Sequence, residues 1–74
     1  MLVRSYDGKT IIKAKSLSVQ KNLGGKKEEK YVIAAWGGGL SGVCVATFSD
    51  EKTAIDALEK AFAAFENGAK TYRF

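Results

Sequence analysis

The sequence predicts an α+β domain in which a small antiparallel β-meander of four to five short strands packs against one C-terminal amphipathic helix. Two uncharged runs rich in β-branched and aromatic residues, 31–36 and 43–48, flank a glycine-rich segment, which is typical of a hairpin. Between residues 50 and 67, large apolar residues recur at intervals of three and four, the period of a helix. A length of 74 residues suits a single domain, residues 1–74.

The first twenty residues predict three short strands. The first is expected at 2–6, and Asp7-Gly8 then provides a turn, because both residue types accept left-handed backbone. Strands at 10–13 and 16–20 follow, and their apolar residues change from even to odd positions. A single regular strand would place one of these two sets on the wrong face of the sheet, so we expect a bulge or break near residues 13–16.

The longest uncharged stretch, residues 31–48, is expected to hold the two central strands, after a glycine- and lysine-containing hairpin loop at 21–30. Two other interpretations of this stretch are less favoured. A membrane-spanning helix is disfavoured because four glycines interrupt its centre. Gly37, Gly39 and Gly42 also match a dinucleotide-binding fingerprint, but a strand follows them where that motif requires a helix.

The helix is expected at residues 50–67. Ser49 or Asp50 can cap its N-terminus, and Gly68 can supply the left-handed residue that ends it. Alternation after the helix indicates that Tyr72 and Phe74 add a short strand or close the core. We expect the large residues of its apolar side to be buried against the sheet, with two alanines between them: Ile55, Leu58, Phe62 and Phe65, with Ala54 and Ala61.

The composition gives little basis for catalysis. The chain has no histidine, which removes the commonest general base and metal ligand. Its acidic pairs, 28–29 and 50–51, are explained by a solvated loop and by helix capping. We therefore expect no enzymatic activity, no catalytic or metal-binding residues, no cofactor and no small-molecule substrate.

The single cysteine and the N-terminal residues bear on location. Cys44 has no partner for an internal disulfide, and its place in an apolar run predicts a small buried side chain. The first residues lack the apolar run of a signal peptide. A cytoplasmic location without membrane association is the expectation.

Positive charge is concentrated in the first part of the chain. Residues 1–30 hold eight lysines and arginines against three acids, a net charge of +5, whereas residues 31–74 hold four against five, a net charge of −1. Lysines can bind nucleic-acid phosphates, but they also protect edge strands from unwanted pairing. Nucleic-acid binding is therefore the alternative function, with these candidate residues: Lys13, Lys15, Lys21, Lys26, Lys27 and Lys30.

The function that the sequence favours is binding of a protein partner, or self-association, by a module without enzymatic activity. Aromatic anchors dominate protein interfaces, and Trp36 stands at the end of a predicted strand beside the glycine-rich loop. Trp36, Gly38 and Leu40 are the candidate partner-binding residues. A tryptophan at this position can also pack in the core, against the helix.

The opening of the chain resembles a group of short proteins from Gram-positive bacteria and their phages or mobile elements. Those proteins begin with Met, two apolar residues, Arg-Ser-Gln-Asp and a lysine-containing turn. Arg4, Ser5 and Asp7 match this opening, and Tyr6 replaces the usual glutamine. The resemblance implies a cytoplasmic accessory protein related to phages, and no particular activity. From the residues themselves, we expect Arg4, Ser5 and Asp7 to stabilise the turn that follows.

Overall fold

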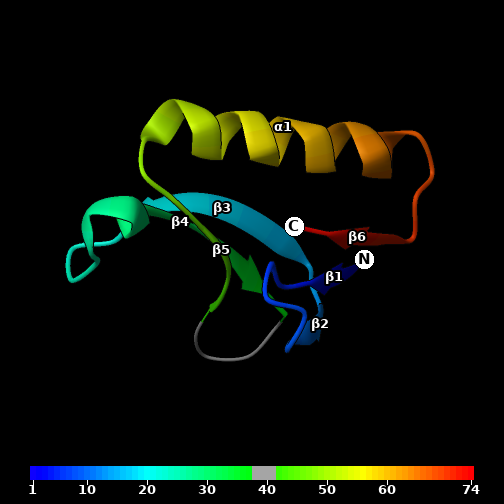
Figure 1. Ribbon diagram of the computed structural model, residues 1–74. Helices are drawn as coiled ribbons and strands as arrows, with labels where there is room; N and C mark the ends of the chain where they lie inside the picture. The colour runs from blue at the N-terminus through cyan, green and yellow to red at the C-terminus, as the bar shows by residue number, and fades with distance from the viewer. Residues whose placement is uncertain (38–41) are drawn as a thin grey trace.

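The computed structural model describes residues 1–37 and 42–74, and within them the chain forms six strands, one α-helix and one short 3₁₀ helix (Figure 1). In chain order these elements are β1 (Leu2–Arg4), β2 (Ile11–Lys13), β3 (Ser16–Lys21), η1 (Lys27–Glu29), β4 (Tyr31–Trp36), β5 (Val43–Phe48), α1 (Glu51–Glu66) and β6 (Thr71–Arg73). The strands and the helix begin and end within two residues of the expected positions.

The predicted α+β class is confirmed, but the strands form two three-stranded sheets where one meander was expected. The sheet β3-β4-β5 is antiparallel throughout and contains the predicted central hairpin. The other sheet has the order β2-β1-β6, in which β1 pairs antiparallel with β2 and parallel with β6. Helix α1 lies across one side of the strands, with β6 beneath its C-terminal half (Figure 1).

Backbone hydrogen bonds join the two sheets at two places. Between β2 and β3 the amide of Ala14 donates to Met1, on the β1 side, whereas that of Lys15 donates to Trp36, on the β4 side. The predicted break near residues 13–16 is therefore present, and it lets one bent segment serve both sheets. At the other junction, the Tyr6 amide donates to the Val45 carbonyl oxygen of β5 over 2.8 Å.

The core is built from small and β-branched side chains. Val3, Ile33 and Val45 are the largest fully buried residues, and they bring together β1, β4 and β5. Alanines occupy most of the other buried positions, so the elements approach closely and bury limited apolar area per residue. Half-buried Leu58 and Phe65 of α1 pack against this core.

The prediction that α1 buries four large apolar side chains is wrong for two of them. Ile55 is 42% exposed and Phe62 is 60% exposed, whereas Ala54 and Ala61 are fully buried. Ile55 and Phe62 lie roughly 80–120° around the helix from the buried alanines. Contact through alanine brings the helix axis closer to the sheet than contact through phenylalanine would allow. The helix is therefore rotated about its own axis so that Ala54 and Ala61 face the sheet.

Both helix ends use the expected residues. The Asp50 side chain accepts a hydrogen bond of 2.7 Å from the Thr53 amide, so Asp50 is the N-cap. Gly68 has a φ of 95° and ends the helix in the left-handed conformation. In residues 1–37 and 42–74, no helix combines the length and the apolar character that crossing a membrane requires.

Candidate interaction surfaces

The turn after β1 is held by a network centred on Asp7, as predicted. The Asp7 carboxylate accepts hydrogen bonds from the Ser5 hydroxyl and, over 3.0 Å, from the Lys9 amide. Arg4 Nε donates to the Gly8 carbonyl oxygen, and Gly8 has a φ of 74°, which favours glycine. Ser5 and Asp7 thus bond each other and the backbone of the turn, and Arg4 adds one bond through Nε.

Two acidic side chains, Asp7 and Asp50, have pKa values below the ordinary value. Hydrogen bonds from Ser5 and then from the Lys9 amide hold the pKa of Asp7 below its ordinary value. Hydrogen bonds from Thr53 do the same for the pKa of Asp50. A carboxyl group that served as a proton donor near neutral pH would need the opposite shift. In the described ranges, no cluster of three or more histidine, cysteine or acidic residues is placed to hold a metal ion.

Cys44 is exposed, so its predicted burial is wrong. A bulge between Ile33 and Ala34 makes Ala34 pair with Cys44 and Ile33 pair with Ala46, leaving Val45 without an opposite residue. Val45 and Ala46 are then buried in succession, and Cys44 lies outside the core. Partial burial of the thiol group nevertheless raises its pKa by desolvation, which disfavours the reactive thiolate.

Trp36, the predicted anchor for a partner, packs partly against its own fold. The residue is half-buried, and its indole N–H donates to the Ser18 hydroxyl of β3 over 3.1 Å. A β-carbon placed on Gly42 would lie only 2.9 Å from the indole ring, so the ring covers this glycine closely. Gly38 and Leu40, the other two predicted partner-binding residues, lie outside the described residues.

The six candidate nucleic-acid-binding lysines are exposed but fall into two groups. Lys13 and Lys15 lie next to the end of β3 that pairs with Trp36, whereas Lys21 is the last residue of β3 and the other three lie in and around η1. A strand of six residues separates the groups by roughly 17–20 Å. Glu28 and Glu29 lie within the second group. The six lysines therefore do not form one continuous patch, and nucleic-acid binding stays a prediction.

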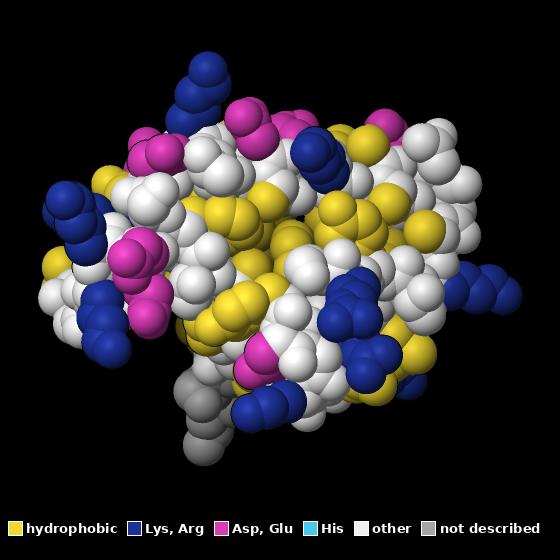
Figure 2. Space-filling view, in the orientation of Figure 1, with side chains coloured by type: hydrophobic (Ala, Val, Ile, Leu, Met, Phe, Trp, Pro, Cys, Tyr) yellow, Lys and Arg dark blue, Asp and Glu magenta, His cyan; other side chains and the backbone are white. Residues whose placement is uncertain are grey.

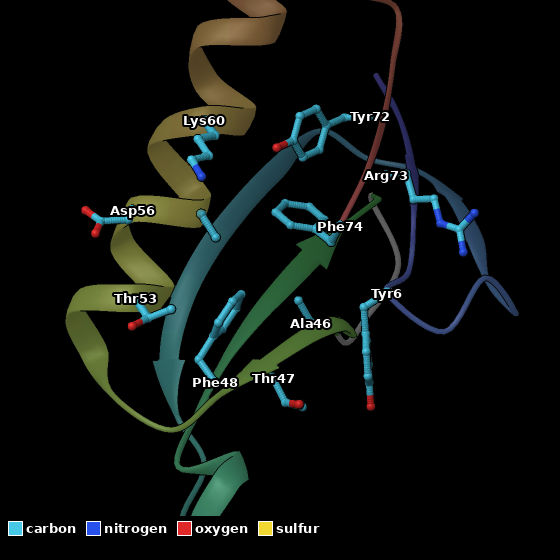
Figure 3. Close-up of a pocket in the computed structure, with 11 residues that line it drawn as sticks. Tyr6, Ala46, Thr47, Phe48, Thr53, Asp56, Lys60, Tyr72, Arg73 and Phe74 are labelled. Atoms are coloured by element: carbon cyan, nitrogen blue, oxygen red, sulfur yellow. The ribbon is translucent and has the colours of Figure 1, made fainter.

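An aromatic cleft of about 410 Å³ opens between α1, β5, β6 and the segment after β1. Figure 3 shows the rings of Phe48, Tyr72 and Phe74 gathered beneath the helix, while Arg73 points to the other side of its strand. The apolar surface beneath α1 is visible as a hollowed band in Figure 2. Tyr72 and Phe74 pack edge to face at 5.0 Å, so the rings also form part of the core.

The aromatic cleft is bordered by charged residues of the helix. Its polar rim includes Lys60 and Asp56, both exposed on α1. Throughout residues 1–37 and 42–74, every buried side-chain nitrogen and oxygen has a hydrogen-bond partner. The described residues therefore offer no unpaired buried side-chain nitrogen or oxygen to a ligand in this cleft.

A second apolar groove, of about 450 Å³, lies beside the exposed side of α1. Phe62 is its most exposed large side chain, and Met1 is 39% exposed at its border. Glu59 contributes the one carboxylate among the residues that line it. The lining residues come from the helix, from β3 and from the first residue: Met1, Leu17, Leu58, Glu59, Phe62 and Phe65.

The outer face of the sheet β2-β1-β6 is exposed and basic. Leu2 and Arg4 project from β1 on the side opposite the buried Val3. A β-carbon placed on Gly8 would lie 3.3 Å from Nη2 of Arg73 and 3.6 Å from Nη2 of Arg4, so both guanidinium groups cover the same turn. A depression of about 320 Å³ on this face is lined by Leu2, Arg4, Ile11, Thr71, Tyr72 and Arg73.

The sequence analysis did not identify either of these two surfaces. The sequence pattern places Arg4 in the turn and Phe62 in the core. For the sheet face, the one indication in the sequence is the alternation of Leu2, Val3 and Arg4. In a strand, this alternation puts Leu2 and Arg4 on the side opposite the buried Val3. Pairing of β1 with β6 adds Arg73 to that face, and no local pattern indicates this pairing.

Comparison with known proteins found no matching family model, no matching curated protein and no matching solved structure.

Proposed function

We propose that this chain is a protein-interaction module without enzymatic activity, and that its contact surface is the exposed side of α1 with the adjoining groove. The observation that carries the proposal is Phe62, a large aromatic residue left 60% exposed. Ile55 lies two helical turns from it and is 42% exposed. Scattered apolar residues are common on protein surfaces, but large ones grouped beside a groove are typical of binding sites.

The energetic argument favours a macromolecular partner. An aromatic side chain at the centre of a surface gains most when a partner removes it from water, and such residues dominate binding energy. The groove beside Phe62 is lined mostly by apolar side chains, with Glu59 as the charged one. A partner with an apolar side chain flanked by positive charge would satisfy both kinds of group.

Affinity capture with tagged protein tests this function. Wild-type protein should retain a protein partner, Phe62→Ser should lose it, and Ala63→Ser should keep it, because Ala63 is exposed on another side of the helix. Nuclease treatment should leave capture unchanged. Capture that is abolished by nuclease, or by reversing Lys26 and Lys27 to glutamate, would instead support the nucleic-acid alternative.

The proposal includes a cytoplasmic accessory role related to phages or mobile elements. The Arg4, Ser5 and Asp7 opening supports the relation to phages, and the lone cysteine supports a reducing compartment. Fractionation of cells that express the chain from its own promoter tests the location. Recovery outside the cytoplasmic fraction would contradict it.

A further inference from the structure

The outer face of β2-β1-β6 presents two rows of exposed side chains. Ile11, Arg4 and Arg73 are register neighbours and form one row. Lys13, Leu2 and Thr71 form the other. Three positive charges therefore surround two large apolar residues, of which Ile11 is 65% exposed and Leu2 is 43% exposed. No acidic residue belongs to either row.

The hydrogen bonds of the adjacent turn leave Arg4 able to bind a further acceptor. Asp7 is the acidic residue of the adjacent turn, and its hydrogen bonds come from Ser5 and the Lys9 amide. The neighbouring charge that lowers the pKa of Asp7 is that of Lys9. Arg4 donates to a backbone carbonyl through Nε alone, which leaves its terminal nitrogens for another acceptor.

The exposed side of α1 has the opposite charge. Residues at intervals of four, four, three and four share one side of a helix. Five residues of α1 follow this spacing and alternate between acidic and apolar: Glu51, Ile55, Glu59, Phe62 and Glu66. We call them the acidic stripe. The stripe therefore carries three carboxylates and two exposed apolar side chains.

We propose that the acidic stripe of one copy binds the basic face of β2-β1-β6 of a second copy. Three carboxylates then meet three cations, and two apolar side chains meet two apolar side chains. Arginine is suited to such pairing because its planar group binds carboxylates through two hydrogen bonds. The inference rests on the proposed function, because it names the partner of the same helix surface.

Charge also determines which surfaces pair. Two acidic stripes would repel each other, and so would two basic faces, which disfavours a symmetric dimer through either surface. The pairing is therefore head-to-tail, with stripe against face. In this arrangement the exposed Ile11 enters the groove beside Phe62, where Glu59 can pair with Arg4 or Lys13.

Each copy can use both surfaces at once. Tyr72 of β6 packs against Phe65 of α1, so the helix lies on the inner side of this sheet. Arg73 and Thr71 alternate with Tyr72 and project from the outer side. A chain bound through its stripe thus keeps its basic face free, and association continues beyond the dimer.

A pair of surface-blocked variants tests the inference. The helix-blocked variant carries Phe62→Ser with Glu59→Lys, and the sheet-blocked variant carries Ile11→Ser with Lys13→Glu. Light scattering coupled to size-exclusion chromatography should show wild-type oligomers and a monomer for each variant alone. A mixture of the two variants should give a one-to-one dimer, since each contributes the surface that the other lacks. Circular dichroism checks that both variants keep the wild-type fold.

Salt dependence provides a second measurement that needs no variant. Raising the salt from about 0.1 M to about 1 M shortens the Debye length from about 10 Å to about 3 Å. Self-association should weaken by about tenfold or more over this range, because exposed ion pairs lose most of their attraction. Glu59→Gln should weaken it without disturbing the fold.

The results separate this inference from the proposed function. A wild-type chain that stays monomeric at millimolar concentration, or variants that fail to combine when mixed, would overturn the self-association. If the same chain still captured a different protein through Phe62, the proposed function would stand. If neither association occurred, both proposals would fall.

Discussion

Replacing Phe62 with alanine should cost the protein little stability, although the sequence pattern places this residue in the core. Full burial of a phenylalanine side chain contributes about 1.5–3 kcal/mol. Phe62 is 60% exposed, so roughly 40% of that contribution, or about 0.6–1.2 kcal/mol, is at stake. Alanine returns part of this, because its helix propensity exceeds that of phenylalanine by about 0.5 kcal/mol.

The neighbouring residue, Ala61, allows the opposite test, in which a small buried side chain is enlarged. Ala61 is fully buried, so Ala61→Leu forces additional atoms into the contact between helix and sheet. Such overpacking typically costs about 1–3 kcal/mol. Ala61→Leu should therefore destabilise the protein more than Phe62→Ala does, although phenylalanine is the larger native side chain.

Urea denaturation followed by circular dichroism measures both changes. The experiment is best done at low protein concentration in high salt, where the proposed self-association does not contribute. A loss of about 3–5 kcal/mol for Phe62→Ala would match a buried phenylalanine and would refute the orientation of the helix described above. So would an Ala61→Leu variant as stable as the wild type.

Three further predictions follow from the described turns and side chains. Gly8→Ala should lower the free energy of unfolding by about 1–2 kcal/mol, because the φ of 74° is unfavourable for alanine, whereas Gly24→Ala, which meets no atom within 4 Å, should melt like the wild type. The folded pKa values of Asp7 and Asp50 are lowered, so their contribution to the free energy of unfolding should be constant above about pH 5 and should fall as the pH drops through those values. Asp7→Ala should lower the melting temperature and reduce this dependence, and a flat wild-type profile in acid would contradict the argument. Cys44 should react with a thiol reagent in the folded protein, slowly at neutral pH and faster as the pH rises, since it is exposed but has a raised pKa; reaction only after denaturation would contradict its position.

Local patterns predicted the elements of this fold well. Asp50 and Gly68 mark the helix ends through backbone hydrogen bonding and left-handed geometry, which depend on a few adjacent residues. The Asp7 turn and the break between β2 and β3 have equally local causes. Such features require no knowledge of what packs against them.

Local sequence patterns did not predict which side chains are exposed on the surfaces. A helical period shows that Ile55 and Phe62 share a broad apolar side with Ala54 and Ala61, but it does not show which of them faces the sheet. That choice depends on how closely the two elements approach. The exposure of Cys44 likewise depends on a bulge that shifts one strand against its neighbour.

The parallel pairing of β1 with β6 has a consequence for synthesis of the protein. β1 is made among the first residues, yet one of its two strand neighbours consists of residues 71–73. Contacts so distant along the chain slow folding, because a long loop must close before they can form. On the ribosome, β1 must therefore wait until residues 71–73 have emerged before its parallel edge is covered. Until then that edge is open to pairing with strands of other nascent chains.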